Sequence, residues 1–146
     1  MVIHLDFKSD LPRPLIQAYR ETHFRVGAPF DFTMLVNQHS QSLASVHDRF
    51  GAKASAFITA CNPLGAELTV DENDIRQRSF AAELTNRGLI YFEGVGQHPT
   101  GDWLGENSFL IIGLELENAK ELARQMEQNA LVWAGRDAVP RLILLR

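Results

Sequence analysis

Cysteine is almost absent from the sequence. Cys61 is the only one among the 146 residues, so an intrachain disulfide cannot form and a zinc site built mainly on thiolates is excluded. A metal site would need histidines and carboxylates instead. His98, Asp102 and Glu106 are spaced by four, but the proline and two glycines between them prevent the helix that would align them. We therefore predict no metal site.

Positive charge and long hydrophobic runs are also scarce. The 14 Lys and Arg residues are outnumbered by 18 Asp and Glu residues, and no basic run is dense enough to neutralise a series of phosphates, so we expect no binding to duplex nucleic acid. The longest apolar runs, 109–113 and 142–145, are far shorter than the ~20 residues of a membrane helix. The first residues lack a basic and an apolar signal region, which predicts a cytoplasmic location and no membrane partner.

Motifs with known chemistry are absent as well. There is no Gly-x-Ser-x-Gly elbow, no phosphate loop and no His-Glu-x-x-His. Gly94-Val95-Gly96 is a fragment of a dinucleotide fingerprint that lacks the third glycine and the following helix. The sequence therefore identifies neither a reaction nor a cofactor.

The composition is that of a folded domain. Apolar residues make up 45% and charged residues 22%, which is close to the average of globular proteins. A chain of this length matches one ordinary domain with one core. We predict a single domain over residues 1–146.

Hydrophobic periodicity and turn residues predict about four helices and five or six strands. The expected helices are 11–24, 40–50, 69–87 and 118 to about 126, and the expected strands are 30–36, 54–61, 89–92, 108–115, 130–134 and 139–145. The strands at 30–36 and 54–61 flank a helix, which predicts a β-α-β unit with right-handed parallel pairing. The fold class is thus α/β with α+β character, a single mixed sheet and a C-terminal hairpin.

A candidate site lies where the apolar stretch 57–63 ends and the next helix begins. Ligands of sheets with β-α-β units tend to sit beyond the carboxyl ends of the parallel strands. Thr59, Asn62, Asn73 and Arg76 converge on such a place, and the guanidinium group suits a carboxylate or a phosphate. We therefore expect a small anionic or nucleotide-like metabolite at this strand-to-helix junction.

The same residues have a structural interpretation. Asn62 can simply form a turn, Asn73 can tie the loop to the helix, and Arg76 can pair with Glu72 or Glu83. The sequence does not decide between the two interpretations.

The glycine-rich segment 93–107 is predicted as a long polar loop and as the second part of the site. Trp103 can stack on a ligand ring or anchor the loop, and Glu106 can act as a general base or accept a hydrogen bond from a ligand. Ser108 stands at the return of the loop to the sheet. Gln128 either reaches the same pocket or satisfies helix carbonyls.

Two alternative functions remain open. Glu106 or Cys61 could serve a hydrolase or transferase, although an unactivated, buried thiol is the simpler interpretation of the cysteine. The very apolar strand at 142–145 could instead form an exposed edge through which an interaction or regulatory module assembles as a homo-oligomer.

Five segments taken together resemble a bacterial family described as a domain of unknown function, family 3293. They are Tyr19-Arg20-Glu21-Thr22, Phe57-Ile58-Thr59-Ala60-Cys61-Asn62-Pro63, Glu72-Asn73 with Arg76, Glu106-Asn107-Ser108-Phe109-Leu110 and Gln128-Asn129-Ala130. The resemblance extends from about Pro14 to Leu145 and implies no activity. It also implies an aromatic residue at the position of Cys61, which argues against a catalytic thiol.

Overall fold

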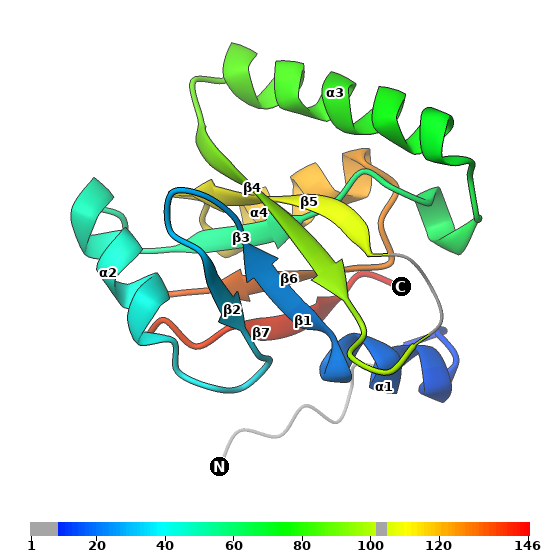
Figure 1. The fold of residues 1–146 in the computed structure, drawn as a ribbon, viewed down its shortest axis with the longest axis horizontal. Coiled ribbons are helices and arrows are strands. Elements are labelled where there is room, and N and C mark those ends of the chain that lie inside the picture. The colour runs from blue at the N-terminus through cyan, green and yellow to red at the C-terminus, as the bar shows by residue number, and fades with distance from the viewer. Residues whose placement is uncertain (1–8, 102–104) are drawn as a thin grey trace.

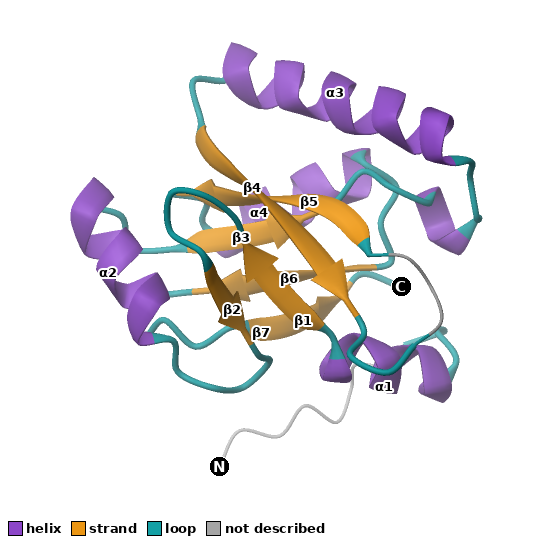
Figure 2. Cartoon of the chain, in the orientation of Figure 1, coloured by secondary structure: helices purple, strands orange, loops and turns teal. Residues whose placement is uncertain are grey.

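The computed structural model describes residues 9–101 and 105–146. In these residues the chain forms four α-helices, a short 3-10 helix and one sheet (Figures 1 and 2). The elements are α1 (Arg13–Glu21), β1 (His23–Val26), β2 (Phe32–Met34), α2 (Gln41–Phe50), β3 (Ser55–Ile58), η1 (Pro63–Gly65), α3 (Val70–Asn86), β4 (Ile90–Gln97), β5 (Glu106–Ile112), α4 (Leu116–Gln125), β6 (Ala130–Ala134) and β7 (Arg141–Leu144). No helix in the described ranges is long and apolar enough to cross a membrane.

The sheet of the described residues has seven strands in the order β2-β1-β4-β5-β3-β6-β7, and each neighbouring pair is antiparallel. The predicted mixed sheet with a parallel β-α-β pairing is therefore wrong. The strands that flank α2, β2 and β3, run in the same direction but are separated by β1, β4 and β5. The predicted C-terminal hairpin is confirmed, since Ala130 lies opposite Leu144 in the β6–β7 pair.

β1 is a strand that the sequence prediction assigned partly to the first helix. The helix ends at Glu21, where the Thr22 hydroxyl donates to the carbonyl of Ala18 at 2.7 Å and the Thr22 backbone becomes extended. From there Phe24 and Val26 are buried while Arg25 between them is exposed, the period of two that defines a strand. This additional strand makes the sheet seven-stranded rather than five- or six-stranded.

Both ends of the segment predicted as a long loop, 93–107, belong to the strands of a β-hairpin. β4 continues to Gln97 and β5 begins at Glu106. A Cβ atom on Gly94 would lie 2.6 Å from the Arg25 carbonyl oxygen and 2.7 Å from Cε2 of Phe57. Glycine is present there because the backbone packs closely against its neighbours, a role of strand glycines that resembles a loop signal in the sequence.

Helices cover both faces of the sheet, and alternate residues of each strand face opposite hydrophobic clusters. One cluster joins α3 and α4 to the sheet through Phe80, Leu84, Leu122, Ile58, Phe109 and Ile111. The other joins α2 to the opposite face through Leu43, Val46, Phe24, Phe57, Leu110 and Val132. The sheet is therefore the middle layer, with the core divided between its two faces.

The junction between β3 and α3 has an unusual backbone and a strong helix start. Asn62 has positive φ and ψ angles of 48° and 64°, a left-handed conformation that asparagine tolerates better than most residues. Farther on, Thr69 accepts from the Glu72 N–H at 3.1 Å, and the Glu72 carboxylate accepts from the Thr69 N–H at 3.0 Å. These reciprocal hydrogen bonds form a capping box, and it fixes where α3 begins.

Candidate functional site

A cleft of about 690 Å³ lies beside α1, at the end of the sheet where β3 and β4 finish and β1, β5 and β6 begin. We call it the α1 cleft. Leu15 and Tyr19 line it from α1, while Phe24, Phe57 and Val132 line it from the sheet. Because the sheet is antiparallel, starting and finishing strands meet here, rather than the carboxyl ends of parallel strands alone.

Most of the candidate residues from the sequence lie on this cleft. Its polar lining includes Thr59, Cys61, Asn62, Asn73, Glu106, Ser108, Gln128 and Asn129. Arg76 is not among the lining residues, and Trp103 lies outside the described residues. The ligand-binding roles assigned to these residues stay predictions.

Glu106 is a half-buried carboxylate on this cleft. Its Oε2 accepts a hydrogen bond from Nδ2 of Asn62 at 2.8 Å, and its other oxygen has no hydrogen-bond partner within the described residues. Burial raises the pKa of Glu106 above its ordinary value, and the bond from Asn62 offsets this only in part. The group can therefore accept a hydrogen bond or hold a proton nearer to neutral pH than a surface glutamate.

Asn62 and Asn73 form a reciprocal pair that supports Glu106. The Asn62 backbone N–H donates to Oδ1 of Asn73 at 2.8 Å, and Nδ2 of Asn73 donates to Oδ1 of Asn62 at 2.9 Å. The same Asn62 oxygen also accepts from the Leu68 N–H at 3.0 Å. This is the loop-to-helix tie considered from the sequence, and it holds the Asn62 side chain where it meets Glu106.

Tyr19 and Asn129 also line the cleft, although they were not among the predicted site residues. Burial raises the pKa of the Tyr19 phenol, the Asn129 side chain lowers it, and the charge of Glu106 raises it further. The phenol therefore stays protonated and can donate a hydrogen bond. Both residues belong to the segments that carry the family resemblance, which was the signal available for finding them.

Thr59 and Ser108 line the cleft but use their hydroxyl groups within the chain. The Thr59 hydroxyl donates to the backbone carbonyl of Asn107 at 2.6 Å, and the Ser108 hydroxyl donates to that of Glu106 at 3.1 Å. The Thr59 bond connects the end of β3 to the start of β5, and the Ser108 bond lies within the first residues of β5. Both residues thus help to position Glu106.

Cys61 and Gln128 also line the cleft and use their polar groups within the chain. Nε2 of Gln128 donates to the carbonyl of Cys61 at 3.0 Å and to that of Met126 at 3.1 Å, while Sγ of Cys61 donates weakly to the Asn107 carbonyl at 3.5 Å. Burial raises the pKa of the Cys61 thiol. A thiol with a raised pKa is a poor nucleophile at neutral pH.

Arg76 ties three segments together from outside the cleft. Its Nε donates to the carbonyl of Ala60 at 2.6 Å and one terminal nitrogen donates to that of Met126 at 2.9 Å, while the other lies 3.5 Å from the Glu127 carboxylate. The partner considered from the sequence, Glu72 or Glu83, is not used. The guanidinium therefore satisfies carbonyls at the end of β3 and after α4.

The charge of the cleft is one-sided. Among the described residues that line it there is no Lys, Arg or His, whereas Glu67, Asp74 and Glu106 are acidic. The first turn of α3 adds Asp71 and Glu72 beside the helix N-terminus, which reduces its attraction for anions.

The described part of the chain contains no cluster of three or more His, Cys, Asp or Glu side chains that could hold a metal ion. Of the residues considered from the sequence, Asp102 lies outside the described ranges. Nε2 of His98 lies 2.9 Å from the Glu21 carboxylate at the end of α1.

Comparison with known proteins bears on the family alone. Comparisons with the curated proteins and with the solved structures gave no match. One family model matches residues 58–131, just over half of the chain, and this range holds most of the junction together with Glu106 and Gln128. The bacterial origin implied by the resemblance stays a prediction. The chain belongs to the family described as "Protein of unknown function (DUF3293)".

Proposed function

We propose that the protein binds a small molecule in the α1 cleft, with Glu106 as the main polar anchor. The observation that carries this proposal is a half-buried carboxylate with one oxygen held by Asn62 and the other without a partner among the described residues. A carboxylate oxygen that has no partner in the protein is open to a ligand N–H or O–H group, and a hydrogen bond to a charged acceptor in a partly desolvated site is a strong one. The volume, about 690 Å³, is in the range of small-molecule sites.

The lining favours a neutral or cationic ligand that carries hydrogen-bond donors. The anionic class predicted from the sequence relied on Arg76, whose donors are directed to Ala60, Met126 and Glu127 instead. Without a basic residue among its described lining residues, the cleft offers an anion little compensation for its lost hydration. We therefore still propose a small metabolite at the junction, but a neutral or cationic one instead of an anion.

Part of the ligand is apolar and planar. Phe24 and Phe57 line the cleft side by side, with ring centroids 5.5 Å apart in an edge-to-face arrangement. Together with Leu15 and Val132 they give the cleft an apolar surface in addition to its polar junction. A ring with an amine or hydroxyl substituent matches both surfaces.

A ligand screen tests the proposal. Thermal-shift and calorimetric titrations would compare ring-containing amines and alcohols with phosphorylated metabolites, using the wild type, Glu106→Gln and the exposed control Glu121→Gln. We expect hits among the amines and alcohols, with affinity reduced about tenfold or more by Glu106→Gln. If the only hits are phosphorylated compounds, or if Glu106→Gln binds as well as the control, the proposal is wrong.

Acid–base catalysis on the bound ligand is the second candidate, and it extends the predicted hydrolase or transferase. The favouring observation is the raised pKa of Glu106 together with the Tyr19 phenol on the same cleft. NMR of a ligand from the screen would show conversion by the wild type and none by Glu106→Gln at saturating ligand. A ligand that the wild type leaves unchanged after prolonged incubation would contradict this candidate.

A further inference from the structure

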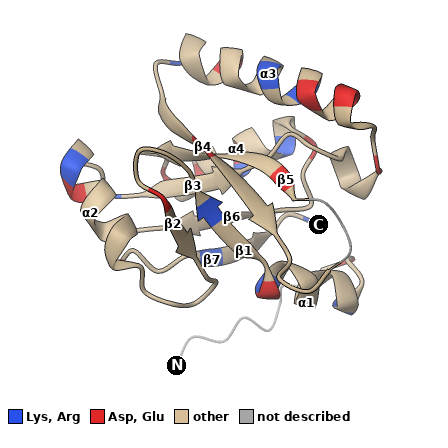
Figure 3. Ribbon diagram, in the orientation of Figure 1, with Lys and Arg blue, Asp and Glu red and all other residues tan. Residues whose placement is uncertain are grey.

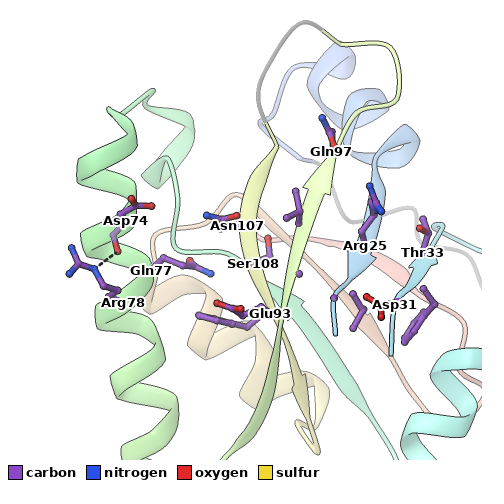
Figure 4. A pocket seen from close by; sticks show the side chains of 16 residues that line it. Arg25, Asp31, Thr33, Asp74, Gln77, Arg78, Glu93, Gln97, Asn107 and Ser108 are labelled. Carbon is purple, nitrogen blue, oxygen red and sulfur yellow. Dashed lines mark hydrogen bonds between the residues drawn. The ribbon is translucent and has the colours of Figure 1, made fainter. Parts of the chain in front are cut away.

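A second hollow lies between α3 and the strands β1, β4 and β5, on the face of the sheet that α3 packs against (Figure 4). We call it the α3 groove, and its volume is about 670 Å³. Gln77 and Arg78 line it from α3, while Arg25, Glu93 and Val95 line it from the strands. None of these five residues lines the α1 cleft.

Gln77 presents a buried hydrogen-bond donor without a partner. The residue is 8% exposed. Among the buried side-chain nitrogens and oxygens of the described residues, Nε2 of Gln77 is the one that lacks a hydrogen-bond partner. Its Oε1 accepts from the Ala60 N–H at 3.1 Å. Because that N–H must donate, the amide cannot be turned around, and Nε2 is fixed as the donor.

The side chains around Gln77 supply the complementary group. Figure 4 shows Gln77 extending from α3 toward the strands, and Glu93 and Asn107 directed from β4 and β5 toward α3. The Glu93 carboxylate accepts hydrogen bonds only, so Gln77 and Glu93 form a donor and an acceptor on facing sides of the groove. Phe109 and Val95 add apolar surface to the lining of the groove.

The charges along the groove are mixed. Arg25 and Arg78 lie among Asp31, Asp74 and Glu93, so the two signs nearly offset each other, and Figure 3 shows both signs along α3 with a basic residue on β1. A groove of this kind does not select its ligand by net charge. Hydrogen-bond pattern and shape then decide what binds.

We propose that the α3 groove binds a planar cyclic amide, a ring in which an N–H lies next to a C=O as in uracil and hypoxanthine. The ring carbonyl accepts from Nε2 of Gln77, and the ring N–H donates to the Glu93 carboxylate. The ring lies against Phe109 and Val95. The residues proposed to bind the ring do not line the α1 cleft, and the proposal does not rest on the function proposed for that cleft.

Nucleosides without phosphate groups are suitable probes. Uridine and inosine carry the required edge, whereas 3-methyluridine and 1-methylinosine keep the ring and the carbonyl but lack the N–H. In two-dimensional ¹H–¹⁵N NMR spectra we expect uridine or inosine to shift the Gln77 side-chain amide signals, which the Gln77→Glu spectrum identifies by their loss. The N-methylated analogues are expected to bind about tenfold more weakly or not at all.

Variants separate this site from the α1 cleft and from general effects on folding. Glu93→Ala changes an exposed residue and is expected to weaken uridine or inosine binding about tenfold, while Glu121→Ala is the exposed control. Glu106→Gln is expected to leave this binding unchanged. The proposal is overturned if methylated and unmethylated nucleosides bind equally, if Glu93→Ala has no effect, or if neither uridine nor inosine binds at millimolar concentration.

Discussion

Asn62 is the residue on which the geometry of the junction depends most. One side chain donates to Glu106 and accepts from both Leu68 and Asn73, while its backbone N–H donates to Asn73. It does so in a left-handed conformation. Hydrogen bonding and backbone conformation therefore make separate contributions, and two substitutions can measure them.

Asn62→Ala removes the side-chain hydrogen bonds. It also places alanine, which tolerates a positive φ angle less well than asparagine, at this position. We expect it to lower the free energy of unfolding by about 2–4 kcal/mol, measured by urea denaturation. Asn62→Gly loses the same hydrogen bonds but tolerates the conformation, so we expect it to be about 1 kcal/mol less destabilising. Equal losses in both variants would show that the backbone conformation carries no cost.

Glu106 should make stability depend on pH in an unusual direction for a carboxylate. Its folded pKa is raised above the ordinary 4.5 by burial, so between 4.5 and the folded pKa the folded state binds more protons than the unfolded state. Stability is then lost as the pH rises through this window. We expect Glu106→Gln, which keeps an acceptor for Asn62, to be more stable than the wild type at neutral pH.

The measurement is the urea midpoint of wild type, Glu106→Gln and Glu121→Gln from acid to neutral pH. The control should follow the wild-type profile because Glu121 is exposed. A wild type that is more stable than Glu106→Gln at neutral pH would contradict the expected sign.

At the scale of elements, β4 shows how one residue type can mislead. In the sequence Gly94 and Gly96 suggested a loop, but both lie in strand β4. The surroundings of the two glycines differ. A Cβ on Gly94 would meet Arg25 and Phe57 at under 3 Å, whereas the nearest atoms to a Cβ on Gly96 lie at 3.7 Å. The first glycine is required by packing and the second is not.

Gly94→Ala is therefore expected to destabilise the protein by about 2–4 kcal/mol, because backbone and aromatic ring must both move. Gly96→Ala on the same strand is the matched control, with an expected change within about 0.5 kcal/mol. Thermal and urea denaturation of the two variants provide the comparison. Similar stabilities would show that the sheet relaxes around Gly94 at little cost.

The elements that the sequence predicted well have local signals. Ser40 and Gly51 bound α2, the Thr69 capping box starts α3, and β6 has the predicted limits. Strand order was not predictable, because pairing such as β4 with β1 joins segments far apart in the chain. The sheet was predicted mixed for the same reason: a helix between two strands suggests parallel neighbours but does not exclude three intervening strands.

The candidate site was predictable to a similar extent. Residues near the junction in sequence, such as Asn62 and Asn73, were placed together by local argument, and Glu106 joined them through the expected return to the sheet. The direction of a long side chain is not a local property. Arg76 therefore turned toward carbonyl groups that only the packing of α4 brings near.

At the scale of the whole molecule, stability is expected to be uneven. β3 and most of β5 are buried, whereas no residue of α1 is. In native-state hydrogen exchange we expect β3 and β5 amides to exchange most slowly and α1 amides to exchange by local opening. Because α1 lines the cleft, such opening would also expose the cleft. Uniform protection of α1 and the central strands would contradict this.

Self-association through the last hairpin stays a prediction. β7 is at one end of the sheet of the described residues, and Leu142, Ile143 and Leu144 are only half-buried. Sedimentation over a range of concentrations would measure it directly.

The first residues of β5 separate the two hollows. Asp74, Asn107 and Ser108 line both the α1 cleft and the α3 groove, and successive residues of a strand point to opposite faces. A displacement of this short segment toward one side would narrow one hollow and widen the other. Ligands of the two sites would then influence each other's affinity, and thermodynamic linkage requires that influence to be equal in both directions.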